Sequence, residues 1–330
     1  MKRNIENKEY EFVVIGGGLS GICAAIAAAR HGAKTALVQD RPVIGGNASS
    51  EIKMHICGAD IHATKPNTRE TGIIEELLLT NRIKNPQQSF SVQDYVFEEI
   101  VRAEPNLDLY LNTRMRNVQM KDNVIVSIEA EQMTTEKLYR FNARYFADTT
   151  GDGFLGYCAG AEFMYGRESR YEFNEKDAPE THDNKLMGNS LMFTAKDMGY
   201  PVPFEKPDWA YSYSEEDLKR RDHSEITSGY WWIEASSSEI IEKGDDIRKE
   251  LVKMLFGIWD HIKNVPGHNA ENYALDWIGA LPGKRESRRL KGDYVLTEND
   301  LVDGKVFYDA VAYGGWNMDM HENGNMSFLD

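Results

Sequence analysis

The sequence predicts an α/β fold built on a parallel β-sheet, with a mixed α+β region after it. Two observations near the N-terminus lead to this prediction: a short apolar run that ends in three glycines, and an alanine-rich stretch followed by a second apolar run. The 330 residues are 41% apolar, which is enough to bury a core, so the chain is not expected to be disordered.

The first elements are a strand, a glycine turn, a helix and a second strand. Residues 10–15 are mostly apolar and are typical of a buried parallel strand. Residues 22–30 are rich in alanine, a strong helix former, and Gly32 lies just beyond them, where a helix commonly ends. Residues 35–38 are again apolar. This order within about 30 residues is that of a βαβ unit, so we expect a Rossmann-like domain.

The remaining segments divide the chain into two predicted domains. Apolar residues recur at helical spacing in residues 70–83, 94–103 and 240–262, whereas residues 107–111, 124–130, 138–147 and 230–235 are typical of strands. Residues 167–185 are polar and are expected to form a loop. We therefore expect the Rossmann-like domain at residues 1–165, with a helical insertion at about 53–105. A mixed α+β substrate domain is expected at residues 166–330.

The charge and the cysteines limit the classes of partner. The formal net charge of −15 argues against nucleic acid, because phosphate backbones require a basic surface. Cys23, Cys57 and Cys158 are few and far apart, as in proteins of a reducing compartment. Residues 1–10 are not an apolar leader, and no apolar run is long enough for a membrane span. We expect a cytoplasmic protein with a small-molecule substrate and no membrane partner; the oligomeric state is left open.

The glycine turn carries the first cofactor motif, Gly16-Gly17-Gly18-Leu19-Ser20-Gly21. Gly16 is expected to form the tight turn, Gly18 to let a pyrophosphate approach the backbone, and Gly21 to bring helix and strand together. Leu19 and Ser20 lie at the helix N-terminus, where N–H groups and the helix dipole favour phosphate. Because the motif lies between a predicted strand and a predicted helix, it indicates a dinucleotide site.

The end of the second strand departs from the usual dinucleotide pattern. An acid that binds the ribose hydroxyls is expected there, but the sequence has Gln39 followed by Asp40. Gln39 has the expected position and its amide still hydrogen-bonds a hydroxyl, whereas Asp40 would point to the other side of the strand. Either side chain remains a candidate. The missing acid argues against a dehydrogenase that selects NAD by a strand-end carboxylate.

Two further glycine segments follow strands. The first is Gly45-Gly46-Asn47-Ala48-Ser49-Ser50, whose paired glycines allow a ligand close to the backbone and whose Asn47 and Ser49 offer polar groups. The second is Asp148-Thr149-Thr150-Gly151-Asp152-Gly153. An ordinary surface loop is the alternative for the first segment, and a plain turn capped by Asp152 is the alternative for the second.

Together these segments resemble the FAD-dependent oxidoreductases with two dinucleotide-binding folds, which are related to glutathione reductase and to the fumarate-reductase flavoproteins. Two later segments also resemble this family: Leu281-Pro282-Gly283-Lys284-Arg285-Glu286-Ser287-Arg288-Arg289 and Gly292-Asp293-Tyr294-Val295-Leu296-Thr297. The resemblance runs through nearly the whole chain. Its first half is specific for flavin binding, whereas its second half does not identify the substrate.

The resemblance implies FAD as the cofactor and a role for each matching residue. The glycines of the first motif would meet the pyrophosphate, Gln39 the adenosine ribose, and the backbone of Met115 the adenine. The residues implied in cofactor binding are Gly16, Gly18, Leu19, Ser20, Gly21, Gln39, Asp40, Arg41, Gly45, Gly46, Asn47, Ser49, Met115, Thr150, Gly151 and Asp152. Family members usually continue with a further glycine-rich segment that contacts the flavin ring, so we expect the chain to be truncated at its C-terminus, within the substrate domain.

Three residues are candidates for catalysis beside the flavin, which itself carries the redox chemistry. His55 and His321 are candidate acid–base groups, although lone histidines are more often structural. Arg285 lies in a basic cluster that suits an anionic or polar substrate, and an internal Arg–Glu network is the alternative. The sequence contains no Cys/His motif or Asp-rich loop that predicts a metal site.

The sequence therefore predicts an FAD-dependent oxidoreductase that transfers hydride between flavin and a small polar molecule. The resemblance favours a carbohydrate-related or hydroxylated substrate. An NAD-dependent protein with the same βαβ unit is the second hypothesis, and Gln39 and the Gly45-Gly46 loop argue against it. A non-catalytic fragment that binds nucleotide, or nothing, is the third.

Overall fold

The computed structural model describes residues 4–59, 69–312, 314, 321 and 326–329. The chain divides into two compact units. Unit 1 consists of Met1–Ser50, His55–Glu180 and Arg288–Asp319, and unit 2 consists of Glu51–Met54, Thr181–Ser287 and Met320–Asp330. Unit 1 thus contains the predicted βαβ unit, and unit 2 contains the long amphipathic helix.

Unit 1 contains a four-stranded sheet with the strand order β4-β3-β2-β8. Its strands are β2 (Phe12–Ile15), β3 (Thr35–Val38), β4 (Leu107–Tyr110) and β8 (Tyr145–Asp148), and α1 (Leu19–Arg30) connects β2 to β3. All three strand pairings are parallel. The predicted parallel sheet and its βαβ unit are therefore confirmed.

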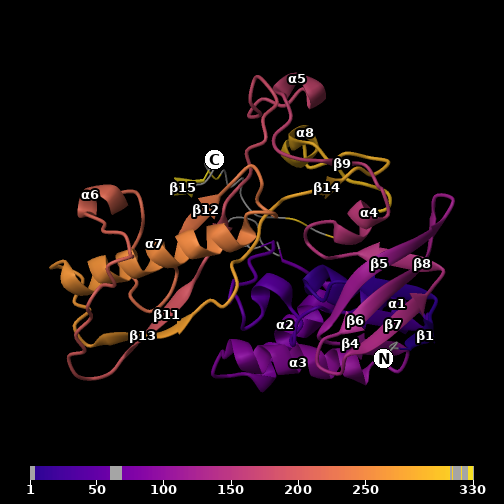
Figure 1. The fold of residues 1–330 in the computed structure, drawn as a ribbon, viewed down its shortest axis with the longest axis horizontal. Helices are drawn as coiled ribbons and strands as arrows, with labels where there is room; N and C mark the ends of the chain where they lie inside the picture. Colours follow the sequence, from indigo (N-terminus) through magenta and orange to yellow (C-terminus); the bar gives the residue numbers. More distant parts are fainter. Residues whose placement is uncertain (1–3, 60–68, 313, 315–320, 322–325, 330) are drawn as a thin grey trace. The chain divides into compact units, whose positions relative to one another are not determined.

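Helices cover one face of this parallel sheet. They are α1, α2 (Gly72–Lys84) and α3 (Phe90–Ala103), drawn from indigo to purple in Figure 1. Side chains alternate between the two faces of a strand, so Val14 and Leu37 point to the helical side. There they join one buried cluster with Ile26, Leu77 and Phe97 of the three helices.

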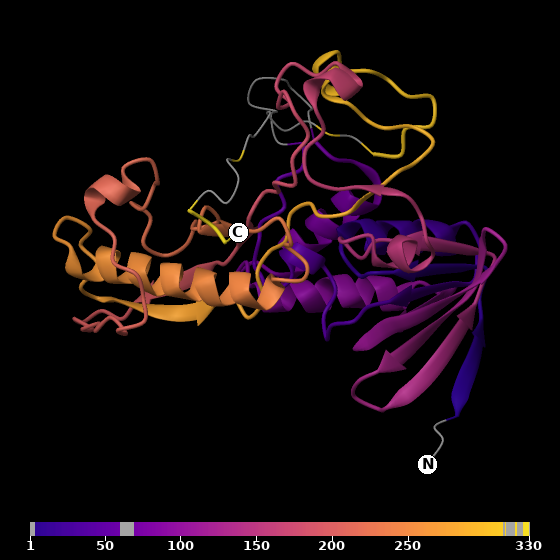
Figure 2. The same cartoon turned by 45° about the horizontal axis from the view of Figure 1, so that its top comes forward.

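A second sheet covers the opposite face, with the strand order β1-β7-β6-β5. Its strands are β1 (Ile5–Glu9), β5 (Thr113–Lys121), β6 (Val124–Gln132) and β7 (Lys137–Asn142). Val13 and Val38 of the parallel sheet pack against Ile128 and Phe141 of this second sheet. Figure 2 shows the second sheet as a separate layer near the N-terminus. Unit 1 is therefore a three-layer structure of helices, parallel sheet and second sheet.

The prediction of a single strand at residues 138–147 is wrong. The chain instead forms β7, which pairs with β6, and then β8, which pairs with β2 in the parallel sheet. Only residues 143 and 144 separate the two strands. Periodicity does not reveal this crossing, because two strands separated by only two residues form one continuous run in the sequence. The strands β1 and β5 were not predicted, since their exposed sides are largely polar.

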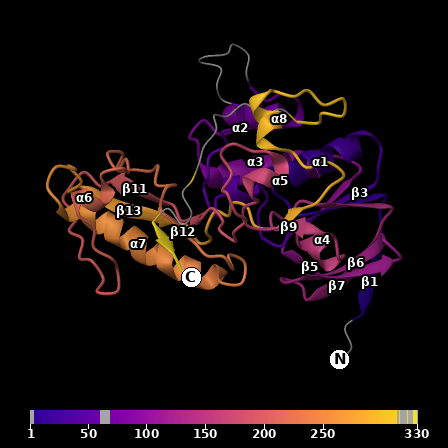
Figure 3. The ribbon, with the colours of Figure 1, turned by 90° about the horizontal axis from the view of Figure 1, so that it is seen from above.

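Unit 2 is built on α7 (Gly244–Asn264), whose buried face includes Ile247, Leu251 and Ile258. β11 (Phe193–Asp197) pairs antiparallel with β13 (Tyr273–Ile278), and Figure 3 shows α7 running beside this pair. The rings of Phe193 in β11 and Trp259 in α7 have centroids 5.6 Å apart. The helix predicted at 240–262 is thus confirmed apart from residues 240–243, which form turns.

A smaller sheet completes unit 2, with β12 (Glu234–Ser236) between β10 (Asn189–Ser190) and β15 (Ser327–Phe328). The strand predicted at 230–235 is only partly correct, because β12 begins at Glu234. Of the aromatic residues before it, Tyr230 and Trp232 are buried, whereas Trp231 is exposed. The hydroxyl of Tyr230 donates to the Glu225 carbonyl at 2.7 Å, and Nε1 of Trp232 donates to the Asp222 carbonyl at 2.9 Å. The polar atoms of both rings are thereby satisfied.

The remaining elements are short. They are η1 (Gly46–Ala48), α4 (Phe154–Cys158), β9 (Phe163–Met164), α5 (Arg170–Phe173), α6 (Glu215–Leu218), β14 (Arg289–Leu290) and α8 (Glu298–Val302). α5 lies within the loop predicted at residues 167–185. Among the described residues, no helix has both the length and the apolar character that crossing a membrane requires.

Candidate functional site

The carboxyl ends of the parallel strands lie at one edge of the sheet, where the loops after β2 and β8 contact each other. The hydroxyl of Thr149 lies 2.9 Å from the Ile15 carbonyl oxygen and 2.7 Å from that of Gly16. The backbone N–H of Thr149 also donates to the carbonyl oxygen of Ile15, at 2.8 Å. From β2 the chain continues to β3 on one side, whereas β8 lies on the other. Ligands of doubly wound sheets bind at such a switch point.

Gly16 and Gly21 are required by the packing of the glycine turn itself. Gly16 has a φ of 108°, and a Cβ there would lie 2.2 Å from the carbonyl oxygen of Thr149. A Cβ on Gly21 would lie 2.0 Å from the carbonyl oxygen of Gly16. This geometry agrees with the tight turn and the close helix approach that the motif predicts.

Gly18 differs from both because it faces open space. Its backbone is extended, with φ −68° and ψ 175°. A Cβ built on Gly18 would have no heavy atom of the described residues within 4 Å, apart from atoms of its neighbours in the chain. The first intrahelical bond of α1 runs from Ile22 N–H to the Gly18 carbonyl, at 2.9 Å. The N–H groups of Leu19, Ser20 and Gly21 precede that bond, in the position from which helices bind anions.

Gln39 follows β3, and its side chain folds back onto the glycine turn. Its Oε1 accepts a hydrogen bond from Gly17 N–H at 2.7 Å, and its Nε2 donates to the Val43 carbonyl at 3.1 Å. The residue is 4% exposed, so this amide joins the loops after β2 and β3. A carboxylate has no donor and cannot make both bonds. Asp40, by contrast, is exposed, with its Oδ1 3.9 Å from Nε of Arg41.

The substitution Gln39→Glu is expected to destabilise the protein without cofactor by about 1–3 kcal/mol, because it sets a carboxylate oxygen against the Val43 carbonyl. Urea unfolding at neutral pH, followed by circular dichroism, measures the change. Asp40→Asn is the matched control on an exposed neighbour, with an expected change within about 0.5 kcal/mol. Equal stability of Gln39→Glu and the parent chain would refute the bridging role of Gln39.

The loop at residues 45–50 is joined to the same turn. Gly45 N–H donates to the Gly17 carbonyl at 2.7 Å, and Gly45 forms a parallel bridge with Gly18. A Cβ on Gly46 would lie 3.1 Å from Cα of Gly18, so the loop approaches the turn closely. The buried Ser49 hydroxyl donates to the Gly46 carbonyl at 2.7 Å, whereas Asn47 is exposed. Ser49 therefore shapes the loop, and Asn47 is the more accessible of the two candidates.

The loop after β8 is shaped by Asp148 and Thr150. The carboxylate of Asp148 accepts hydrogen bonds from Thr150 N–H at 3.0 Å, from the Thr150 hydroxyl at 2.7 Å, and from Gly156 N–H at 2.9 Å. The Thr150 hydroxyl in turn accepts from Phe154 N–H at 2.8 Å. Gly151 is exposed with a φ of 84°, so its backbone is the accessible part of this loop.

Met115, the predicted adenine contact, lies in β5 with its side chain in the core between the two sheets. It is 3% exposed, so its side chain serves packing. Its backbone pairs with Ala130, and the strand register shifts immediately afterwards, between Met115 and Asn117. A contact between the Met115 backbone and adenine remains a prediction.

Two of the predicted catalytic residues, Arg285 and His321, contact the buried carboxylate of Glu234. Arg285 Nη2 forms an ion pair with Glu234 Oε1, and His321 Nδ1 lies 2.9 Å from the same oxygen. Arg285 Nη1 also donates to the Gly188 carbonyl at 2.9 Å and to the Ser190 hydroxyl at 2.8 Å. Both Nη atoms of Arg285 are thus engaged within unit 2, as in the internal Arg–Glu network that the sequence left as an alternative.

His55, the third candidate, belongs to unit 1 and is exposed. It follows the loop that contacts the glycine turn, with Ser50 as the last residue of that loop. The structure therefore groups Arg285 with His321 and leaves His55 on the unit that carries the glycine motif. The catalytic roles of all three residues remain predictions.

The structure also brings together four residues that sequence reasoning did not single out: Glu215, His223, His261 and His268. They come from α6, the segment after it, α7 and the segment after α7. Burial, together with the nearby rings of His261 and His223, lowers the pKa of the His268 imidazole. The concentration of three of the chain's eight histidines between residues 223 and 268 was the available sequence signal, but their spacing matches no metal motif.

Comparison with known proteins links the chain to flavoenzymes. A family model described as "FAD dependent oxidoreductase" matches residues 11–328. The aerobic glycerol-3-phosphate dehydrogenase of Staphylococcus haemolyticus (strain JCSC1435) is 32% identical over 82 residues, which are 23% of this chain and 15% of that enzyme. The enzyme of the same name from Staphylococcus aureus (strain USA300) is 39% identical over 54 residues, 16% of this chain and 10% of that enzyme. The matched segments thus span a small part of these relatives.

Two solved structures match part of the chain. The glycerol-3-phosphate dehydrogenase from Bacillus halodurans, solved in complex with FAD, has a TM-score of 0.35 and 12% identity, covering 61% of this chain and 44% of that protein. A geranylgeranyl bacteriochlorophyll reductase-like protein from Thermoplasma acidophilum has a TM-score of 0.43 and 13% identity, covering 84% of this chain and 66% of that protein.

Proposed function

Because the chain belongs to the FAD-dependent oxidoreductase family and FAD is its cofactor, we propose that it transfers hydride between FAD and a small, hydroxylated substrate. The observation that carries this proposal is the open space beside Gly18 at the N-terminus of α1. A pyrophosphate fits there, because backbone N–H groups and the helix dipole attract its charge and no side chain of the described residues blocks it.

The residues of this edge would hold FAD as follows. The N–H groups of Leu19, Ser20 and Gly21 would bind the pyrophosphate, with the loops at 45–50 and 149–153 beside it. Oε1 and Nε2 of Gln39 each make one hydrogen bond within the protein. One lone pair of Oε1 and one N–H of Nε2 are therefore left for a ribose hydroxyl. The remaining candidates in this assignment are Asp40, Arg41, Gly45, Gly46, Asn47, Ser49, Met115, Thr150, Gly151 and Asp152.

The substrate class is proposed from chemistry and from the relatives. FAD, when bound, accepts the hydride that the oxidation of an alcohol releases. The hydroxyl proton then needs a base, and His55 is our candidate because it is an exposed histidine on the unit with the glycine motif. The relatives named glycerol-3-phosphate dehydrogenases support a polar, hydroxylated substrate. We also propose a cytoplasmic location, since no disulfide joins the three cysteines.

The first test is the absorbance spectrum of the purified chain, with and without added FAD. We expect the visible bands of bound, oxidised flavin, and release of FAD on heating. The flavin-loaded protein is then mixed without oxygen with glycerol 3-phosphate, glycerol and simple sugars. Bleaching of the visible band by at least one of these compounds is the expected result.

Two different failures separate the parts of the proposal. A chain that takes up no FAD refutes the cofactor site. A chain that binds FAD but is bleached by none of the hydroxylated compounds refutes the substrate class alone. His55→Gln tests the base: we expect a lower kcat and the loss of one ionisation from the pH profile of kcat, with FAD binding unchanged.

A further inference from the structure

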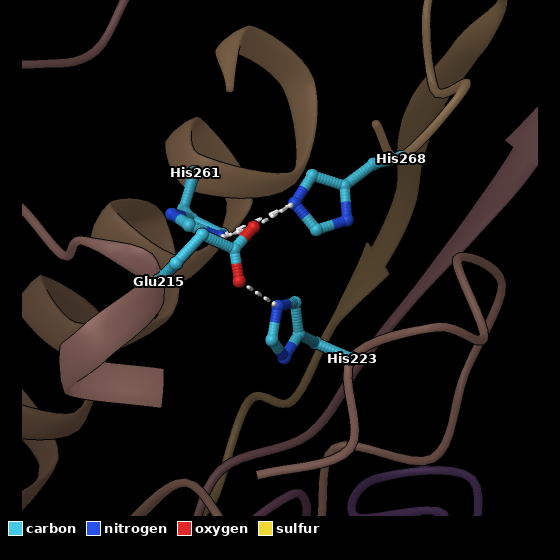
Figure 4. Close-up of side chains that lie close together, drawn as sticks. All are labelled: Glu215, His223, His261 and His268. Carbon is cyan, nitrogen blue, oxygen red and sulfur yellow. Dashed lines mark hydrogen bonds and ion pairs between the residues drawn. The ribbon is translucent and has the colours of Figure 1, made fainter. Parts of the chain in front are cut away.

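Four potential metal ligands converge in unit 2: Glu215, His223, His261 and His268. Figure 4 shows the carboxylate of Glu215 between the three imidazole rings. Its Oε1 lies 3.3 Å from Nε2 of His261 and 3.2 Å from Nε2 of His268, and its Oε2 lies 3.5 Å from Nε2 of His223. The Nε2 atoms of His261 and His268 are 3.2 Å apart. One ligand atom from each of the four residues therefore lies within 4.8 Å of the other three.

The separations among Oε1 of Glu215 and the Nε2 atoms of His261 and His268 match three edges of a coordination tetrahedron. With metal–nitrogen and metal–oxygen bonds near 2.0–2.1 Å, neighbouring ligand atoms of a tetrahedral zinc site are about 3.3 Å apart. The three separations among Glu215 Oε1, His261 Nε2 and His268 Nε2 are 3.2–3.3 Å. Nε2 of His223 lies 3.5 Å from the other carboxylate oxygen, and one ligand atom from each of the four residues lies within 4.8 Å of the other three. The side chains need little movement to coordinate one ion.

Backbone carbonyls determine which ring nitrogen faces the cluster. Nδ1 of His261 lies 3.0 Å from the Tyr213 carbonyl oxygen, and Nδ1 of His223 lies 2.6 Å from that of Arg221. A carbonyl only accepts hydrogen bonds, so both Nδ1 atoms carry the hydrogen. A neutral ring then directs the lone pair of Nε2 to the centre. Metal-bound histidines use the same arrangement, in which the other ring nitrogen donates to a carbonyl.

A bound cation would remove the unfavourable contacts between lone pairs in the cluster. With neutral rings, Nε2 of His261 and Nε2 of His223 each present a lone pair to the carboxylate of Glu215, so an acceptor faces an acceptor at both contacts. One divalent ion interacts favourably with all four groups and adds no donor that would remain unsatisfied.

The surrounding structure fixes the segments that carry the ligands. Near the end of α7, Nζ of Lys263 donates to three carbonyls between residues 270 and 273, at 2.7, 2.9 and 2.8 Å. These bonds tie the segment with His268 to the helix. Trp232 Nε1 donates to the Asp222 carbonyl at 2.9 Å, next to His223. A preformed set of ligands loses little conformational entropy on binding an ion.

We propose that Glu215, His223, His261 and His268 bind one divalent transition-metal ion, most favourably zinc, and that this ion stabilises unit 2. Three imidazoles and one carboxylate suit zinc, cobalt, nickel or copper rather than magnesium or calcium, which prefer oxygen ligands. Four protein ligands fill a tetrahedral shell, as in structural zinc sites. The ion would link α6, the segment after it, α7 and the segment that leads to β13.

The experiment uses the full chain, stripped of metal with a chelator and titrated with zinc against a competing chelator. We expect one zinc per chain and a thermal unfolding midpoint that rises with zinc concentration. Cobalt added in place of zinc is expected to give the intense visible absorption of tetrahedral Co²⁺. Neither readout requires FAD or substrate, so the result is independent of the proposed enzymatic function.

Single ligand variants test the assignment. His223→Ala and His268→Ala are expected to weaken zinc binding by at least about 100-fold, since even the loss of a group that only hydrogen-bonds to a ligand costs about 10- to 100-fold. Glu215→Gln tests the carboxylate with little change in shape, and is expected to weaken binding as well. His182→Ala is the control, because His182 is an exposed histidine of the same unit outside the cluster.

Circular dichroism of each metal-free variant separates lost binding from lost folding. The proposal is overturned if the parent chain binds no zinc at micromolar concentrations, or if the ligand variants bind as tightly as His182→Ala. An octahedral cobalt spectrum would equally overturn it. If one ligand variant fails to fold, the parent titration and the cobalt spectrum still decide the matter.

Discussion

The substitution Gly18→Ala is expected to weaken FAD binding by about 10- to 100-fold while the protein without cofactor keeps its stability. A methyl group at Gly18 meets open space in the described structure, and its extended backbone is accessible to any residue. With FAD bound, the same methyl group would press on the pyrophosphate. A steric cost of about 1–3 kcal/mol corresponds to this loss of affinity.

The matched comparison is Gly16→Ala, two residues earlier in the same turn. Its methyl group would lie 2.2 Å from the Thr149 carbonyl oxygen, at a φ of 108° that alanine rarely adopts. We expect this variant to lose about 2–6 kcal/mol of folding stability, from backbone strain and overpacking together. Gly16→Ala therefore damages the fold, whereas Gly18→Ala damages only the cofactor site.

FAD titration by fluorescence quenching and urea unfolding of both proteins without cofactor measure the two effects. If Gly18→Ala binds FAD as tightly as the parent chain, the pyrophosphate does not lie against Gly18. If Gly18→Ala instead unfolds like Gly16→Ala, the open space seen beside Gly18 is not present in solution. Either result would remove the main support for the cofactor site.

The substitution Glu234→Ala is expected to destabilise unit 2 by about 3–5 kcal/mol, because it leaves the guanidinium of Arg285 largely buried without its carboxylate. Glu234 has 0% exposure, and the Arg285 side chain is 17% exposed. His321 Nδ1 also loses the oxygen that lies 2.9 Å away. Chemical unfolding followed by tryptophan fluorescence measures the loss, since Trp232 lies in the turn before β12.

Two controls define what the ion pair contributes. Glu239→Ala removes an exposed ion pair with Lys243, and is expected to cost less than about 1 kcal/mol. The double variant Glu234→Leu/Arg285→Met removes both charges, and is expected to be more stable than Glu234→Ala alone. If Arg285 mainly bound substrate, Arg285→Met would raise KM and leave stability unchanged. That outcome would support the prediction that Arg285 acts on the substrate.

The glycine motif was interpretable from sequence because each of its requirements is local. Gly16 needs a positive φ, Gly21 needs close backbone contact, and both follow from one strand, one turn and one helix in succession. The role of Gln39 was only partly predictable. Its position after β3 indicated the ribose, but the sequence does not show that its amide also bridges Gly17 N–H and the Val43 carbonyl.

The sequence by itself determined the βαβ unit, the amphipathic helix α7, and the family with its FAD cofactor, because short-range periodicity and glycine spacing encode these features. The tertiary structure decided the separation of β7 from β8, the pairing of Arg285 with Glu234, and the grouping of Glu215 with three histidines. These features depend on contacts between residues that are far apart in the chain, such as the pairing of β8 with β2. Only the folded backbone brings such residues together, so neither spacing nor composition predicts them.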